Sequence, residues 1–194
     1  MHERRFNPAH ANRLEDPERL RWLPPNEIVE ALRIQPGTVV ADVGAGTGYF
    51  ALPLARAVGP AGKIVAVDAQ QEMLALLEKK LNAPELAHVE LVQAEAHETS
   101  LQAGSCALVF LANIWHEFDD RKAVLHEAIR ILQPGGRVAI LDWRTDVEPA
   151  AGPPLDHRIA AAHAEHELRE AGFAPHGSAR LWRYSWLVQG EKQP

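Results

Sequence analysis

The pattern of hydrophobic and polar residues switches repeatedly between two periods from residue 38 to residue 171. Short apolar runs rich in β-branched residues predict five strands, at 38–43, 63–68, 88–93, 106–112 and 137–142. Elsewhere apolar residues recur every three or four positions and predict helices at 50–58, 70–81, 120–132 and 159–171. Strands that alternate with helices are typical of βαβ units with right-handed crossovers. The pattern therefore predicts an α/β fold built on a parallel sheet.

Both ends of the chain depart from this alternation. At the front, a polar, arginine-rich lead is followed by one short predicted helix between Pro24 and Pro36. In the tail, aromatic residues alternate with polar ones, at Trp182, Tyr184 and Trp186. Because a period of two is typical of strands, the tail predicts a terminal antiparallel strand pair. We expect its aromatic side chains to pack in the core.

Length and composition favour one domain. The chain has 194 residues, of which 46% are hydrophobic, and this suffices for a single well-filled core. A formal net charge of −6 gives no long-range attraction for phosphate backbones, so we expect no nucleic-acid partner. The only cysteine, Cys106, can form neither an internal disulfide nor a multi-thiol metal site. No apolar run reaches the length of a signal-peptide core or a membrane span. These features together favour a cytoplasmic protein.

A glycine-rich turn follows the first predicted strand, with Gly44, Gly46 and Gly48 leading into a helix. Such a turn lets a ligand approach the backbone and the N–H groups of the helix start, although it can also be purely structural. A dinucleotide site needs a glycine where this chain has Tyr49, which disfavours a nicotinamide or flavin cofactor. Asp42 would repel a pyrophosphate but could balance an ammonium group. The turn therefore favours a nucleotide-like ligand that carries positive charge.

Asp68 ends the second predicted strand, 20 residues after Gly48. A carboxylate at this position can accept hydrogen bonds from both hydroxyls of a ribose. Alternatively, Asp68 caps the helix that begins near Gln70.

Five segments in order resemble motifs of class I S-adenosylmethionine-dependent methyltransferases: VADVGAGTG at 40–48, VAVD at 65–68, QAEA at 93–96, LVFLANIWHE at 108–117 and LQPGGRVAILD at 132–142. The resemblance covers about residues 25–145. It is closest to the small-molecule group that is similar to ubiquinone and menaquinone biosynthesis methyltransferases (methyltransferase type 11). Two positions depart from the pattern of this group, because Glu95 and Ala107 stand where many members have aspartate.

The resemblance implies a Rossmann-like fold with a mostly parallel seven-stranded sheet, a C-terminal antiparallel strand pair and helices on both faces. It implies S-adenosylmethionine as cofactor and S-adenosylhomocysteine as product. Residues 1–194 would form one methyltransferase domain, with 1–35 as a substrate lid and 36–194 as the cofactor-binding core. The residues that it implies for the cofactor site are Asp42, Gly44, Ala45, Gly46, Asp68, Ala69, Glu95, Ala96 and Asn113. Among them, Glu95 would reach the adenine amino group and the N–H of Ala96 the ring.

The acceptor site is harder to identify from the sequence. Ligands of parallel α/β sheets lie beyond the carboxyl ends of the strands, which nominates His116, Trp143 and Arg144 as substrate residues. His116 is a candidate general base or, equally, a histidine bonded to the backbone at a helix entry. Methyl transfer from a sulfonium mainly requires collinear placement, so a base can also be absent. Arginine and histidine residues in the lead and in the loop 144–159 allow a weak hypothesis of an anionic acceptor. The acceptor and the methylated atom stay open.

Two other functions compete with small-molecule methyl transfer. A methyltransferase-fold protein can bind or regulate without turnover, and a nicotinamide-dependent oxidoreductase is a weaker alternative. A metal site is not expected, because His116 lacks the second histidine of a zinc-protease helix. His163 and His166 lie on one predicted helix without a third firm ligand and indicate an exposed polar face.

Overall fold

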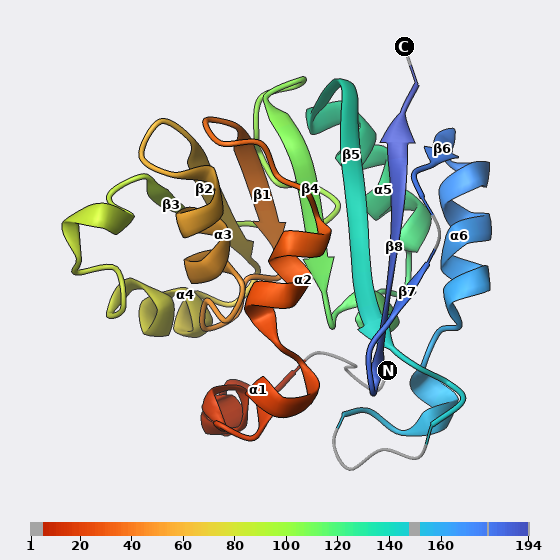
Figure 1. Ribbon diagram of the computed structural model, residues 1–194, viewed down its shortest axis with the longest axis horizontal. Helices are drawn as coiled ribbons and strands as arrows, with labels where there is room; N and C mark the ends of the chain where they lie inside the picture. The colour runs from red at the N-terminus through yellow and green to blue at the C-terminus, as the bar shows by residue number, and fades with distance from the viewer. Residues whose placement is uncertain (1–5, 148–151, 178, 194) are drawn as a thin grey trace.

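The computed structural model describes residues 6–147, 152–177 and 179–193 and shows a central twisted sheet with helices on both faces (Figure 1). The sheet order is β3-β2-β1-β4-β5-β8-β6, and β7 pairs only with β8. The strands are β1 (Val39–Val43), β2 (Lys63–Asp68), β3 (Val89–Gln93), β4 (Cys106–Ala112), β5 (Leu132–Trp143), β6 (Phe173–Pro175), β7 (Arg180–Leu181) and β8 (Ser185–Lys192).

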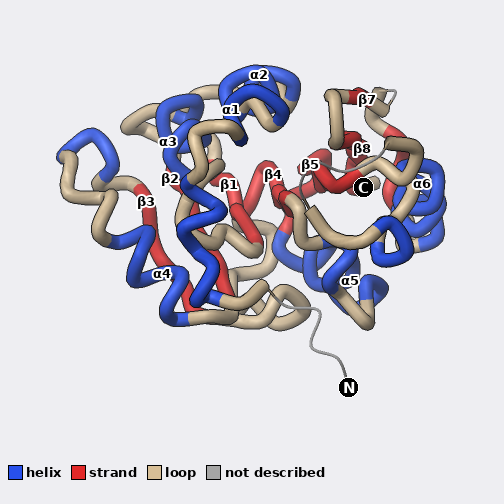
Figure 2. Tube along the Cα trace, turned by 90° about the horizontal axis from the view of Figure 1, so that it is seen from below, coloured by secondary structure: helices blue, strands red, loops and turns tan. Residues whose placement is uncertain are grey.

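The α-helices are α1 (Arg19–Trp22), α2 (Pro25–Ala31), α3 (Ala51–Val58), α4 (Gln71–Glu78), α5 (Arg121–Ile131) and α6 (Ala161–Glu170). Short 3₁₀ helices occur at η1 (Pro8–Glu15), η2 (Pro84–Leu86), η3 (Trp115–Glu117) and η4 (Leu155–His157). Figure 2 shows α2 and α3 on one side of the sheet and α5 on the other. No helix within the described residues has both the length and the apolarity to cross a bilayer.

The inner strands are apolar on both faces because helices cover both. Along β1, Val40 packs in the cluster that holds α2 and α3, whereas Ala41 and Val43 pack in the cluster that holds α5 and α6. Neighbouring side chains of a strand point to opposite faces, so a strand buried on both sides has no polar face to expose. This explains why the central strands appear in the sequence as continuous apolar runs.

Strands β1 to β5 pair in parallel, and β8 runs antiparallel to β5. The chain moves outward from β1 through β2 to β3, and then returns to the other side of β1 with β4. This reversal makes the carboxyl ends of β1 and β4 a topological switch point, where ligands of open α/β sheets bind. The reversal therefore positions the candidate site.

The fold class predicted from the sequence is confirmed, with differences in detail. Both β6 and β7 pair with β8, and the two-residue β7 makes the sheet eight-stranded within the described residues. Strand β5 begins at Leu132, directly after α5, rather than at residue 137. The register with β4 shifts between Cys106 and Leu108, and this irregularity accommodates Pro134, Gly135 and Gly136, which lie inside β5 although the sequence pattern placed them before a strand that begins at residue 137.

Candidate active site

A cavity of about 580 Å³ lies at the switch point. Its wall is formed by the turn after β1, the carboxyl ends of β2 and β4, the loop after β3, and residues of the N-terminal segment. Nine residues that the sequence assigned to a cofactor all line it: Asp42, Gly44, Ala45, Gly46, Asp68, Ala69, Glu95, Ala96 and Asn113. Topology thus brings together side chains that are up to 71 positions apart in the chain, from Asp42 to Asn113.

The glycine turn is fixed against the end of β2 by backbone hydrogen bonds. The N–H groups of Gly44 and Ala45 both donate to the carbonyl of Val67, at 2.7 and 3.0 Å. Gly44 has φ 73° and Gly46 has φ 55°, in the left-handed region that favours glycine. A Cβ on Gly44 would lie 2.4 Å from Cδ1 of Ile114, so this glycine is also required by close packing.

Asp68 connects the end of β2 to the glycine turn. One carboxylate oxygen accepts a hydrogen bond from the N–H of Gly46 at 2.8 Å, and the other accepts one from the N–H of Gln70 at 2.9 Å. The N-cap position of α4 is Gln70, so Asp68 forms a turn ahead of the helix and is not its cap. Asp68 therefore fixes the glycine turn to the end of β2 and lines the cavity.

Two buried oxygens near the turn have no hydrogen-bond partner among the described residues: Oδ2 of Asp42 and Oδ1 of Asn113. Asp42 is 2% exposed. Burial, and next the charge of Asp68, raises the pKa of Asp42 to about 7. Asn113 has φ 58°, a conformation uncommon for a residue with a side chain. Buried acceptors of this kind are costly unless a donor or cation meets them, and both residues line the cavity, from which such a group could reach them.

The N-terminal segment 6–23, which we call the cover, closes one side of the cavity. Lys80 of the core donates to Glu15 of the cover at 2.6 Å and to the carbonyl of Thr47 at 2.7 Å, and the Thr47 hydroxyl donates to Glu15. Gln70 donates to the carbonyl of Phe6 at 3.0 Å. Sequence patterns missed this structure in the polar lead, because its contacts reach residues far along the chain.

Arg19 of the cover lines the cavity and is 7% exposed. Its guanidinium lies 4.1 Å from the ring centroid of Tyr49 and donates to the carbonyl of Leu14. Burial lowers its pKa below the ordinary value, yet an arginine stays charged at any physiological pH. Arg19 therefore brings a desolvated positive charge to the cavity wall, and the sequence offered no signal beyond an arginine-rich lead.

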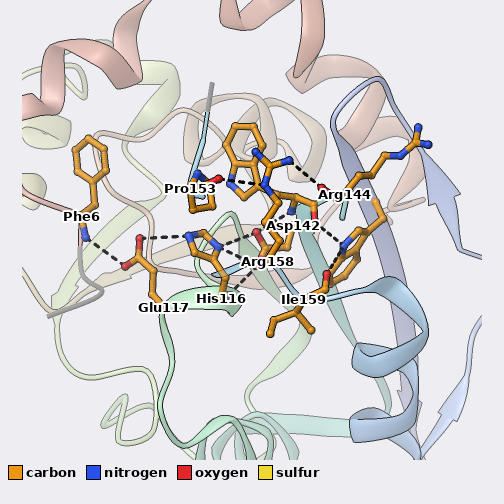
Figure 3. A network of polar contacts seen from close by, with 10 residues as sticks. Phe6, His116, Glu117, Asp142, Arg144, Pro153, Arg158 and Ile159 are labelled. Carbon is orange, nitrogen blue, oxygen red and sulfur yellow. Dashed lines mark hydrogen bonds and ion pairs between the residues drawn. The ribbon is translucent and has the colours of Figure 1, made fainter. Parts of the chain in front are cut away.

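The three residues predicted to contact the acceptor do not belong to the wall of this cavity, as far as the described residues form it. His116 is buried against Asp142 (Figure 3). Trp143 packs on Trp22, with ring centroids 5.3 Å apart. Arg144 pairs with Asp146 at 2.7 Å. The carboxyl end of β5 thus does not form part of the cavity wall made by the described residues.

Glu117 lines the cavity where the sequence suggested its neighbour, His116. Its carboxylate accepts a hydrogen bond from the N–H of Phe6 in the cover at 3.3 Å. Burial raises the pKa of Glu117 to about 7, although His116 acts in the opposite direction. Glu117 directly follows the candidate base His116 in the sequence, and this adjacency is the signal that could have identified it.

The remaining candidates are the arginine and histidine residues of the lead and of the loop 144–159, and the two histidines of α6. Arg158, in the loop, donates from its guanidinium to the carbonyls of Pro153 and Arg144, whereas Arg4 and Arg5 of the lead lie outside the described part of the chain. His163 and His166 are near Glu167 and Glu170 on α6, at 3.3 and 3.4 Å. Within the described residues, no group of three or more His, Cys, Asp or Glu side chains could hold a metal ion.

The chain resembles known proteins in sequence and in fold. Over 116 residues the chain is 32% identical to the demethylmenaquinone methyltransferase of Listeria welshimeri, a match that covers 60% of this chain and 49% of the relative. The chain thus spans about half the length of the curated relatives it matches. Its structure superposes on a "SAM dependent methyltransferase from Aquifex aeolicus" with a TM-score of 0.90 and 28% identity, over 96% of this chain and 99% of the other.

The same fold also occurs in the "[4+2]-Cyclase SpnF", with a TM-score of 0.72 and 18% identity, over 87% of this chain and 80% of that one. A likeness at this identity concerns the fold alone. The family model described as "Methyltransferase domain" matches residues 40–136, which is half of the chain and includes β1 to β4 with the glycine turn, Asp68 and Glu95. The chain therefore belongs to the methyltransferase domain family.

Proposed function

We propose that the protein is an S-adenosylmethionine-dependent methyltransferase that acts on a small-molecule acceptor. The observation that carries the proposal is the pair of unpartnered buried oxygens, on Asp42 and Asn113, beside a glycine turn that Asp68 holds in place. A ligand with an ammonium group next to a ribose fits this arrangement, whereas the pyrophosphate of a nicotinamide cofactor would face the carboxylate of Asp42. The names of the Aquifex and Listeria proteins support the same activity.

The residues of the cavity fit the parts of this cofactor. Asp68 would bind the ribose hydroxyls, Glu95 and the N–H of Ala96 the adenine, and Asp42 with Asn113 the ammonium group. Arg19 would pair with the carboxylate of the amino-acid moiety, because an arginine desolvated by the cover attracts an anion strongly. When bound, the cofactor supplies a methyl group on a positively charged sulfur, which leaves as a neutral thioether.

Methyl transfer places simple demands on this chain. Binding must hold the acceptor nucleophile in line with the methyl carbon and the sulfur, and orientation alone can supply much of the rate. Closure of the cover would exclude water, which strengthens the electrostatic contacts to the cofactor. We propose that residues 1–194 act as one methyltransferase domain, in which 1–35 is the lid and 36–194 the cofactor-binding core.

The cellular compartment and the class of partner are proposed from the buried cysteine and the cavity. We propose a cytoplasmic enzyme, which is supported by Cys106, a buried free thiol. A small-molecule acceptor is supported by the enclosed cavity, and the acidic residues of its wall would repel a phosphate backbone. A binding or regulatory protein without turnover is the alternative that an experiment must exclude, because this fold also supports other chemistry.

Calorimetry on the purified chain tests the cofactor. We expect micromolar binding of both S-adenosylmethionine and S-adenosylhomocysteine, weakened at least about 10-fold in Asp68→Ala, because the ribose contact and the turn geometry are lost together. Asp156→Ala, on an exposed turn, is the matched control and should bind like the parent chain. Transfer of label from methyl-labelled cofactor to a metabolite panel then separates an enzyme from a binding protein. Absence of binding to the unmutated chain would contradict the proposed function.

A further inference from the structure

Three side chains form a line from the sheet into the cavity: Asp142 at the end of β5, and His116 and Glu117 in η3 (Figure 3). Nδ1 of His116 lies 2.9 Å from Oδ1 of Asp142, and Nε2 lies 4.0 Å from Oε1 of Glu117. The imidazole is therefore situated between two carboxylates, one of them fully buried and the other at the cavity wall.

Asp142 fixes the orientation of the imidazole. Its carboxylate accepts hydrogen bonds from the backbone N–H of His116 at 2.8 Å and of Trp143 at 2.8 Å, in addition to the contact with Nδ1. A carboxylate that accepts two backbone N–H donors can meet Nδ1 only as an acceptor, so Nδ1 carries the proton. Nε2 then points toward Glu117 with a free lone pair or, after protonation, with a second N–H.

The surroundings raise the pKa of both His116 and Glu117. Burial alone would lower the pKa of His116, but Asp142 and Glu117 outweigh it and raise that pKa, while Arg158 opposes them. On Glu117, burial raises the pKa to about 7, His116 and the N–H of Phe6 lower it, and Asp142 and Asp68 add to the rise. Near neutral pH the pair can therefore accept a proton from a ligand in the cavity.

We propose that Glu117 is the general base of methyl transfer and that His116, held by Asp142, is a positioning residue that shares the proton with it. This inference rests on the proposed function and deepens it, because it requires an acceptor whose nucleophilic atom carries a dissociable proton, as an amine N–H or a hydroxyl O–H does. The sequence offered His116 as a candidate base or as a histidine bonded to the backbone, but among the described residues it is Glu117, and not His116, that lines the cavity.

The step balances without another reactant. The lone pair of the acceptor atom forms the bond to the methyl carbon as the carbon–sulfur bond breaks, and that bonding pair stays on sulfur. The proton of the acceptor N–H or O–H moves to the carboxylate of Glu117, and His116 stabilises the protonated pair through Nε2. The proton reaches water when the cover opens.

A purely structural role for Glu117 makes a different prediction. As a structural residue, Glu117 would only tie the cover to η3 by accepting the N–H of Phe6. Glu117→Gln keeps a side-chain oxygen that can accept this hydrogen bond but cannot take up a proton. The substitution therefore separates the two roles, and Glu78→Gln on the exposed end of α4 is a matched control for the change of charge.

The first measurement needs no acceptor. Imidazole NMR titration of the full chain, with the His116 signal assigned by His116→Gln, gives the pKa of His116. We expect a fall of at least about 0.5 unit in Glu117→Gln, because a neighbouring carboxylate that favours the imidazolium is lost, and no change in Glu78→Gln. If the pKa of His116 is the same in Glu117→Gln as in the parent chain, the proposal that His116 shares a proton with Glu117 is overturned.

The second measurement concerns the reaction, with labelled S-adenosylmethionine and two protic probes, catechol and sarcosine. We expect Glu117→Gln to lower the rate about 100-fold or more while its affinity for S-adenosylmethionine stays within about 3-fold of the parent. At cofactor concentrations well below saturation the parent kcat/KM should rise with pH through about 7, this rise should vanish in Glu117→Gln, and Glu117→Asp should restore part of it. An unchanged rate in Glu117→Gln would overturn the proposal, whereas loss of cofactor binding by the parent chain would contradict only the proposed function.

Discussion

Burial of the Asp42 carboxyl group at the cavity wall makes the stability of the folded protein depend on pH. Its pKa of about 7 exceeds the unperturbed 3.8, so the folded chain binds a proton that the unfolded chain has already released. A group with a raised pKa contributes stability below its unfolded pKa, and this contribution is lost as pH rises through the folded pKa. Above pH 7 the ligand-free protein therefore carries a charged group without solvent or a partner cation.

Asp42→Asn should stabilise the ligand-free protein in a pH-dependent manner. The variant removes the buried charge, so its advantage in unfolding free energy should grow between pH 5 and pH 8 and reach a few kcal/mol, since each pKa unit corresponds to about 1.4 kcal/mol. Its affinity for S-adenosylmethionine should fall about 10-fold or more. Thermal denaturation at both pH values and calorimetry measure these effects. An equal gain at pH 5 and pH 8 would refute this assignment.

Alanine substitutions at two glycines of the same turn, Gly44 and Gly46, should impair the protein for different reasons. Both have a positive φ, so alanine costs about 1 kcal/mol of backbone strain at either position. A Cβ on Gly44 also collides with Ile114, whereas a Cβ on Gly46 meets only Cδ1 of Leu14, at 3.9 Å, and otherwise faces the cavity. We expect Gly44→Ala to lower the melting temperature more, and Gly46→Ala to lower the affinity for S-adenosylhomocysteine more. The reverse order in the two assays would contradict the orientation of the turn.

At the level of secondary structure, the sequence predicts the elements that have a regular pattern of apolar residues. It misses the features that depend on contacts between residues far apart in the chain. The strands of the sheet are legible because burial on both faces requires continuous apolar runs, and β2 and β4 have the predicted bounds. The sequence suggested a lid in the lead but not the helices η1 and α1 or their contacts, because Glu15 finds its partner Lys80 65 positions along the chain. The link between His116 and Asp142 spans 26 positions and is missed for the same reason.

The cover should be held closed in part by charge. Glu15 accepts from Lys80 and Thr47, so Glu15→Gln should speed the dissociation of S-adenosylhomocysteine several-fold. In the parent chain, raising the salt from about 0.05 M to 0.5 M should have a similar effect, because salt screens exposed charges. Glu18→Gln breaks an exposed pair with Arg21 in the same segment and serves as control. Stopped-flow dissociation rates that do not respond to salt would contradict the role of this contact.

At the scale of the whole molecule, binding should be coupled to protons. The cavity wall includes Asp42 and Glu117, both with a pKa of about 7, and the acidic chain as a whole adds no compensating field. A ligand with a sulfonium and an ammonium group lowers these pKa values, so its binding should release protons near pH 7. Calorimetry in buffers of different ionisation enthalpy counts them. We expect S-adenosylmethionine to release more than S-adenosylhomocysteine, which lacks the sulfonium charge, and proton uptake would contradict this.

The cover also bears on how new activities arise in this family. The match to the methyltransferase domain spans residues 40–136 and excludes residues 6–23, although Phe6, Leu14 and Arg19 form part of the cavity wall. We expect mutations in this short segment to reshape the cavity without disturbing the buried strands of the sheet. If the proposed function holds, we expect sequence changes in the cover to alter which acceptors are used, and exchange of this segment between relatives would test that expectation.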